Sequence, residues 1–355
     1  MSSRRQQSLV GTWLLVIAAM IFGMVVGGGD VRTIGAGFIL QQWQPFFGIL
    51  PPQSHAAWVH LFGLYQRTAQ FQTLHPTMTL AQFKALAWPD ILDRDWGRLM
   101  ALVFAVPLAV FWWRGWISAK LGAWLIALFA AGAIEATMGW MMTYQGMFGL
   151  LHPSPLYLGP HLVLAMLIFT AMLWTGFSLR HPEPMPIEGY TGLRTLLTWS
   201  VGLLIVTIGM GALVAGSGGL HVDHSFPLMN GHFFPRRGWA LHPVWLNLVA
   251  NPRTVQFEHR VIATLTAGVV IVAASIGLRA PLGPRARDLF LLLAGLITLQ
   301  YILGMSTVVS GMGDLGYIHE LTAVLLLASC IACRHALRGA VPRPVATKLT
   351  MKAAE

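Results

Sequence analysis

The sequence predicts an all-α integral membrane protein with eight transmembrane helices, built as two parallel-repeat four-helix bundles with both termini in the cytoplasm. Of the 355 residues, 55% are apolar and only 10% are charged, whereas an ordinary globular domain carries about 25% charged residues. A chain with so little polar surface needs lipid as the solvent for most of it. The composition therefore excludes a soluble globular domain, a disordered chain and a coiled coil, and the two cysteines, Cys330 and Cys333, provide no disulfide scaffold.

Eight apolar runs are long enough, at about 20 residues each, to cross roughly 30 Å of hydrocarbon. The first follows Arg4 and Arg5 and has no small-residue cleavage site, so we interpret it as a retained anchor and not as a signal peptide. The runs start near Leu9, Leu99, Leu121, Tyr157, Thr195, Glu258, Leu289 and Tyr317.

The net charge of +10 would suggest a nucleic-acid partner in a soluble protein, so the positions of the charges matter. Of the 23 Lys and Arg residues, 14 lie at the amino end, between runs 2 and 3, 4 and 5, and 6 and 7, and after run 8. By the positive-inside rule these segments are cytoplasmic. The pattern predicts a multi-pass protein surrounded by membrane lipid, with no nucleic-acid partner.

The two halves of the chain look like a duplicated unit. In each half, a long outer segment follows a glycine-rich helix end and leads to an acid or a histidine followed by arginine, namely Asp93-Arg94 and His259-Arg260. Because four helices separate these equivalent positions, the halves have the same orientation in the membrane. The outer segments run from Asp30 to about Trp96 and from Ser217 to Phe257.

Three histidines lie at the outer ends of apolar helices, namely His161, His259 and His319. Ionisable residues inside a membrane are functional candidates because they are costly in lipid. Two facing histidines at one depth form an axial pair for a haem iron, which we assign to His259 with His319. The alternative is that each is a hydrogen-bonded structural histidine. Arginines on the outer side favour haem, because the propionates need cationic partners.

The chain resembles the haem A synthase family, whose members convert haem O to haem A for terminal oxidases. The matching stretches follow one another in the family's order over nearly the whole chain. They include VGGGDVRTIGAG (26–37), MTLAQFKALAW (78–88), DRDWGR (93–98), GWMM (139–142), PHLVLA (160–165), SFPLMNG (225–231), VQFEHR (255–260) and HELTA (319–323).

The resemblance implies two related bundles with one haem site each, near the outer surface of a bacterial cytoplasmic membrane. Residues 181–355 would hold haem b as a cofactor on His259 and His319. Residues 1–180 would take the substrate haem O beside His161. The predicted propionate contacts are Arg32, Arg94, Arg98 and Arg260.

Two positions depart from the family pattern. Asp90 stands where the family has a glutamate tied to catalysis, and Asp93 stands where it has the first histidine of the substrate site. We predict that Asp90 is the acid/base or cation-stabilising carboxylate. Asp93 would ligate the haem iron, or leave it five-coordinate through His161, or form an ion pair with a nearby arginine. Pro89 predicts that both acids lie in the first turn of their helix.

The predicted function is oxidation of a methyl group of haem O to the formyl group of haem A, with haem iron supplying most of the chemistry. Two alternatives remain, a non-catalytic haem-binding homologue in oxidase assembly or haem hand-over, and a dihaem b-type electron-transfer subunit. The resemblance makes a haem O synthase, terminal oxidase subunits and a second copy of the chain candidate partners.

Overall fold

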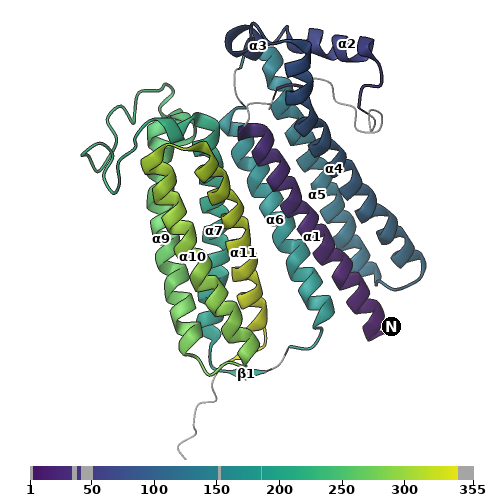
Figure 1. The fold of residues 1–355 in the computed structure, drawn as a ribbon. Helices are drawn as coiled ribbons and strands as arrows, with labels where there is room; N and C mark the ends of the chain where they lie inside the picture. Colours follow the sequence, from purple (N-terminus) through teal and green to yellow (C-terminus); the bar gives the residue numbers. More distant parts are fainter. Residues whose placement is uncertain (1–2, 34–37, 41–50, 151–152, 185, 343–355) are drawn as a thin grey trace, which may run out of the picture.

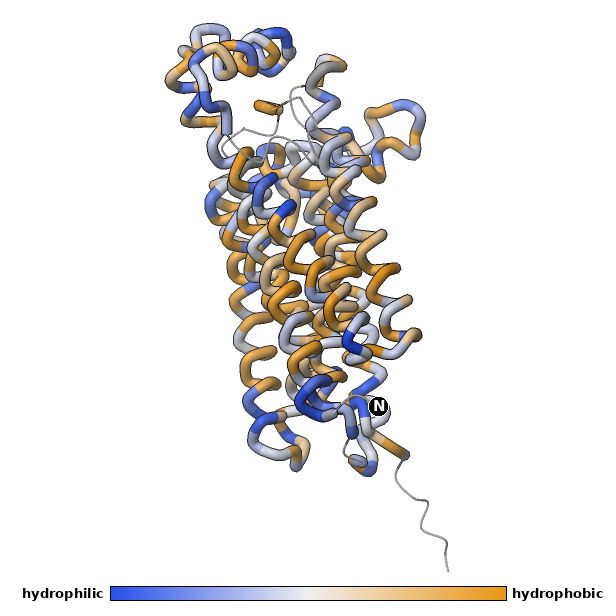
Figure 2. Tube along the Cα trace, turned by 90° about the vertical axis from the view of Figure 1, so that its right-hand side faces the viewer, coloured by the Kyte–Doolittle hydropathy of each residue, from blue (hydrophilic) through white to orange (hydrophobic). Residues whose placement is uncertain are grey.

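Eight long apolar helices form the body of the protein, as predicted. The computed structural model describes residues 3–33, 38–40, 51–150, 153–184 and 186–342, and within them eight helices have the length and composition to cross a membrane. An apolar band covers the helices, with hydrophilic residues at both ends (Figure 2). The eight are α1 (Arg4–Thr33), α4 (Leu80–Trp113), α5 (Ala119–Tyr144), α6 (Pro155–Arg180), α7 (Thr191–Ser217), α9 (Pro252–Arg279), α10 (Pro284–Ser310) and α11 (Gly313–Ala336).

The long helices form two adjacent groups, α1, α4, α5 and α6 in one and α7, α9, α10 and α11 in the other (Figure 1). Helix α6 packs against α7 and α11, so one apolar core runs through both groups. Within the first group, α1 and α6 cross at glycines, where a Cβ atom at Gly11 would lie 2.8 Å from the carbonyl oxygen of Gly176. Small residues allow membrane helices to approach this closely.

Short strands and short helices connect the long helices at their two ends. The strands β1 (Ile187–Glu188) and β2 (Ala340–Val341) pair in parallel, which ties the chain after α6 to the chain after α11. The short helices are α2 (His55–Tyr65), α3 (Ala69–Leu74), η1 (Gln145–Phe148), η2 (Gly219–His221), η3 (Val244–Leu246) and α8 (Asn247–Ala250).

Helices α2 and α3 and the start of α4 form a small domain, residues 55–91, which we call the cap (Figure 1). Its core is aromatic, with Tyr65 and Phe83 fully buried. The Tyr65 hydroxyl lies 2.6 Å from Nδ1 of His75 and 3.2 Å from Oε1 of Gln70. Burial raises the pKa of Tyr65 to about 12. The cap therefore has its own apolar core and a buried polar network.

The prediction that Pro89 marks the first turn of a helix is wrong. Helix α4 begins at Leu80, nineteen residues before the predicted start near Leu99, and Pro89 lies inside it. A capping box between Thr79 and Gln82 starts the helix. An interior proline removes one helical hydrogen bond, and the burial of the surrounding helix in the cap offsets that loss. The charged stretch from Asp90 to Arg98 hid this start, because it separates the first turns of the helix from the apolar run that begins near Leu99.

Candidate haem sites

The four predicted ligand positions share one structural feature. Each side chain lies against a glycine on the long helix that precedes its own in the chain. A Cβ atom added at the glycine would lie 2.5 Å from Asp93 Oδ1 at Gly27, 3.3 Å from His161 Cε1 at Gly139, 3.3 Å from His259 Cε1 at Gly211 and 2.9 Å from His319 Cε1 at Gly304.

Each half contains two such contacts. In the first half they join α1 to α4 and α5 to α6, and in the second half they join α7 to α9 and α10 to α11. A Cβ at Gly27 or Gly304 would force a neighbouring atom to shift, and a Cβ at Gly139 or Gly211 would require the histidine ring to move by a few tenths of an ångström. A parallel duplication of one unit predicts this correspondence, in which Asp93 takes in its half the place that His259 takes in the other.

The carboxyl-terminal site brings His259 of α9 and His319 of α11 together. Their ring centres are 6.4 Å apart and the ring planes are nearly perpendicular, at 88°. A metal bound to one nitrogen of each ring at about 2 Å would separate the ring centres by about 6 Å. Nδ1 of each ring is buried and has no hydrogen-bond partner among the described residues. The two histidines therefore fit an axial pair for a haem iron.

The sequence placed His259 at the opening of its helix, which is wrong by about two turns. Helix α9 begins at Pro252, where the Asn251 side chain accepts hydrogen bonds from the backbone N–H groups of Arg253 and Thr254. This cap starts the helix before the apolar run, so His259 lies within regular helix and its position is fixed.

The predicted propionate contact Arg260 binds the outer segment instead of pointing freely into the site. Its guanidinium donates to the carbonyl oxygens of Ser225 (2.7 Å) and Asp223 (2.8 Å) and to Oε1 of Gln256 (2.9 Å). Nε is buried without a partner among the described residues. Arg260 thus joins the outer segment to the helix that carries His259.

The amino-terminal site contains His161 of α6 and Asp93 of α4. Asp93 lies close enough to Asp90, Arg94 and His161 to interact with them electrostatically. Its Oδ1 is buried and, within the described part of the chain, lacks a hydrogen-bond partner. The amino-terminal half therefore has one imidazole and one carboxylate where the carboxyl-terminal half has two imidazoles.

The arginines near Asp93 have other partners. Arg94 Nε lies 3.0 Å from Oδ1 of Asp90 and Arg94 Nη2 lies 3.3 Å from Oδ2, and Nη2 also donates to the carbonyl oxygen of Leu40 at 2.5 Å. Arg98 pairs with Asp95 at 2.5 Å. Of the predicted propionate contacts, the Arg32 side chain lies outside the described residues.

Sequence reasoning missed Glu135, which belongs to this site. Its Oε1 lies 3.0 Å from Nδ1 of His161, and both side chains are mostly buried. The signal was present, because Glu135 is the single charged residue between Lys120 and Tyr144 of α5, and an acid in such a helix is a functional candidate. Gln300 of α10, also missed, has its Nε2 3.4 Å from Nε2 of His319.

The other histidines and the cysteines lie in different surroundings. His75 belongs to the buried network of the cap, and Nδ1 of His224 lies 3.1 Å from the Val308 carbonyl oxygen. Cys330 and Cys333 are free thiols, both fully buried in α11. Within the described residues, His, Cys, Asp and Glu form no group of three that would hold a metal ion without a macrocycle.

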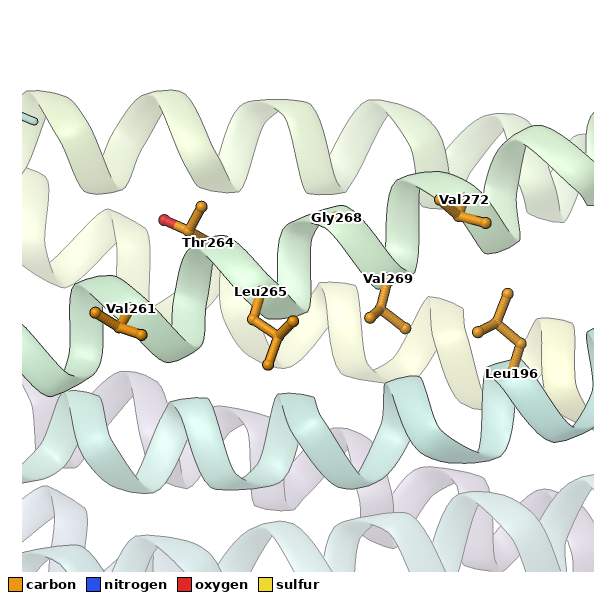
Figure 3. Close-up of a pocket in the computed structure, with 7 residues that line it drawn as sticks. All are labelled: Leu196, Val261, Thr264, Leu265, Gly268, Val269 and Val272. Carbon is orange, nitrogen blue, oxygen red and sulfur yellow. The ribbon is translucent and has the colours of Figure 1, made fainter.

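A groove of about 560 Å³ lies along α9 beside Leu196 of α7 (Figure 3). Its lining is hydrocarbon except for the Thr264 hydroxyl, and its valines and leucines, such as Val261 and Leu265, are half exposed. Such a surface suits lipid acyl chains. It contains none of the predicted ligands, so we do not assign it to haem.

The chain is similar to known proteins over its full length. Residues 11–331 match the family described as "Cytochrome oxidase assembly protein". "Heme A synthase 1" of Acidiphilium cryptum (strain JF-5) is 67% identical over 358 residues, which cover 100% of this chain and 99% of the relative. "Heme A synthase 2" of the same organism is 38% identical, covering 95% and 94%. "Heme A synthase" of Granulibacter bethesdensis is 37% identical, covering 95% and 89%.

Proposed function

Because this chain belongs to the haem A synthase family, we propose that it oxidises a methyl group of haem O to the formyl group of haem A. The observation that supports this most directly is the placement of His161, His259 and His319, each on a long apolar helix and against a glycine of the long helix before it. His259 and His319 together suit a bound haem cofactor. His161 would receive the substrate haem in the other half.

We assign haem b to His259 and His319, which fit it by ring separation and by their unpartnered buried nitrogens. Bound haem b would supply one-electron redox chemistry to this half of the protein. The role of the protein there is to hold both imidazoles in one orientation. Gly211 and Gly304 support that orientation by leaving room for the rings.

Haem O is the proposed substrate of the amino-terminal site, where His161 would bind its iron. Oxidation of a methyl group releases protons, so the site needs a carboxylate near the reacting carbon. Asp90 is our candidate for that role, and Arg94 orients it through both of its oxygens. Asp93, whose buried Oδ1 lies against Gly27 of α1, would ligate the iron or leave it five-coordinate through His161.

The proposed setting is the bacterial cytoplasmic membrane, with both haem sites toward the outer side. The distribution of Lys and Arg supports this orientation. The cap and the second outer segment would then lie outside the membrane. Propionate contacts by Arg32, Arg94, Arg98 and Arg260, and docking of a haem O synthase, terminal oxidase subunits or a second copy, belong to the same proposal.

Pigment analysis tests the activity. The full-length chain is produced in a host that makes haem O, and the haems are extracted and separated. We expect haem A in the extract and haem b in the purified protein. Unchanged haem O with a full complement of haem b would overturn the synthase proposal.

One observation favours a second candidate function. Asp93 occupies a position that in the carboxyl-terminal half carries a histidine, and a carboxylate is a weaker partner than imidazole for reduced haem iron. A homologue that binds haem and transfers it during oxidase assembly would tolerate this change. The pigment experiment distinguishes the two, because only the synthase produces haem A.

A further inference from the structure

Glu135 and Gln300 occupy corresponding places in the two halves. Glu135 lies four residues before Gly139 on α5, and Gln300 lies four residues before Gly304 on α10. Residues four apart share one face of a helix. Each therefore lies one turn from the glycine that faces the histidine, and each contacts that histidine itself.

The two contacts differ in charge. Oε1 of Glu135 lies 3.0 Å from Nδ1 of His161, and the carboxylate's other oxygen is buried without a partner among the described residues. Nδ1 of His161 is itself buried without a hydrogen-bond partner among the described residues, so Oε1 of Glu135 is the carboxylate oxygen placed to accept its proton. At the corresponding place on α10, the neutral amide nitrogen of Gln300 lies 3.4 Å from the other ring nitrogen, Nε2, of His319.

We propose, on the basis of the proposed function, that Glu135 is a positioning residue that makes His161 a more electron-donating haem ligand than His319. A carboxylate that accepts the second N–H of a ligating imidazole fixes the tautomer and the ring orientation, and raises the basicity of the ligand. Greater electron donation favours ferric over ferrous iron. The substrate haem would then have a lower reduction potential than the cofactor haem.

Glu135→Gln tests this inference, because it removes the charge beside His161 and keeps the size of the side chain. The full-length protein, loaded with haem in a host that makes haem O, is titrated by optical spectroelectrochemistry. The component that disappears in His161→Ala is assigned to the amino-terminal site. This readout follows the bound haem and is independent of turnover.

We expect Glu135→Gln to raise the midpoint potential of the amino-terminal haem and to leave the other haem unchanged. A tenfold change in the ratio of oxidised to reduced haem corresponds to 59 mV for one electron, and we expect a shift of about that size. Glu135→Asp, which keeps the charge, should retain part of the wild-type potential.

Two results of this titration would contradict different claims, one about Glu135 and one about the proposed function. If the His161-dependent haem is present and its potential is the same in wild type and Glu135→Gln, the positioning role is wrong and the proposed function stands. If His161→Ala loses no haem, His161 does not bind the substrate, and both proposals are overturned.

Discussion

Arg94 binds both carboxylate oxygens of Asp90 and thereby separates the roles of two acids that lie three residues apart on α4. The distances are 3.0 Å from Nε to Oδ1 and 3.3 Å from Nη2 to Oδ2, whereas Asp93 Oδ1 is buried with no hydrogen-bond partner in the described part of the chain. An ion pair with Arg94 thus orients Asp90 and leaves Asp93 Oδ1 facing α1 at Gly27.

The role of Asp90 in this pair of acids can be tested by substitution. Asp90→Asn removes the charge without changing the size of the side chain, and we expect the formation of haem A to fall by about 10²- to 10⁴-fold, the usual contribution of a general acid or base. Asp95→Asn, which removes the partner of Arg98 on the same helix, is the matched control and should have a much smaller effect. Equal losses in both variants would contradict a special role for Asp90. The measurement is haem A per unit of purified protein.

Asp93→His should create a second imidazole opposite His161. Because the position corresponds to that of His259 in the other half, we expect an additional low-spin haem spectrum of the type given by two histidine ligands. Asp93→Asn, which provides no imidazole, is the control. Optical and electron paramagnetic resonance spectra of the two variants would show whether residue 93 binds the haem iron. Identical spectra would show that residue 93 does not reach the iron.

His259→Ala and His319→Ala should each abolish the low-spin haem b spectrum. The ring separation of 6.4 Å means that one iron needs both residues. His221→Ala, at an exposed position in the outer segment, should leave the spectrum unchanged. A spectrum that persists in either of the first two variants would remove that residue from the ligand set.

Two glycines on α10 provide a matched comparison. A Cβ at Gly304 would lie 2.9 Å from Cε1 of His319, whereas a Cβ at Gly295 meets nothing within 4 Å. Gly304→Ala should therefore displace the His319 ring and reduce the haem b bound per protein. Gly295→Ala should keep the haem and stabilise the helix by up to about 1 kcal/mol. Equal haem content in the two variants would show that the ring tolerates the displacement.

The cap should lose stability at high pH. The folded-state pKa of Tyr65, about 12, lies above the unfolded value of about 10. The folded cap therefore holds the phenolic proton more tightly than the unfolded chain, so the stabilisation is complete below pH 10 and is lost as the pH rises towards 12. Proteolysis of the cap in detergent-solubilised protein between pH 8 and pH 11 would measure this. Tyr65→Phe should remove the dependence, and a variant that keeps it would exclude Tyr65 as the cause.

The eight membrane helices, the candidate histidines and the family can all be predicted from the sequence alone. The eight helices are visible because apolar runs of membrane length are unambiguous in a chain with 10% charged residues. His161, His259 and His319 are visible as candidates because histidine is costly in lipid and rare in such runs. The ordered motifs identify the family from one chain, and the full-length relatives bear this out.

The tertiary structure decided which groups meet. Arg94 pairs with Asp90, and Glu135 lies beside His161. Both arrangements depend on the direction of side chains and on helix packing. A hydropathy pattern contains neither kind of information. The sequence did not predict that α4 starts at Leu80. Helix capping and burial in the cap stabilise its first turns, whereas the prediction used the length of the apolar run. Gly27 and Gly139 lie in motifs that the sequence shows, but no motif reveals that the four glycines face the ligand positions, since a close approach between helices exists only after the helices have packed.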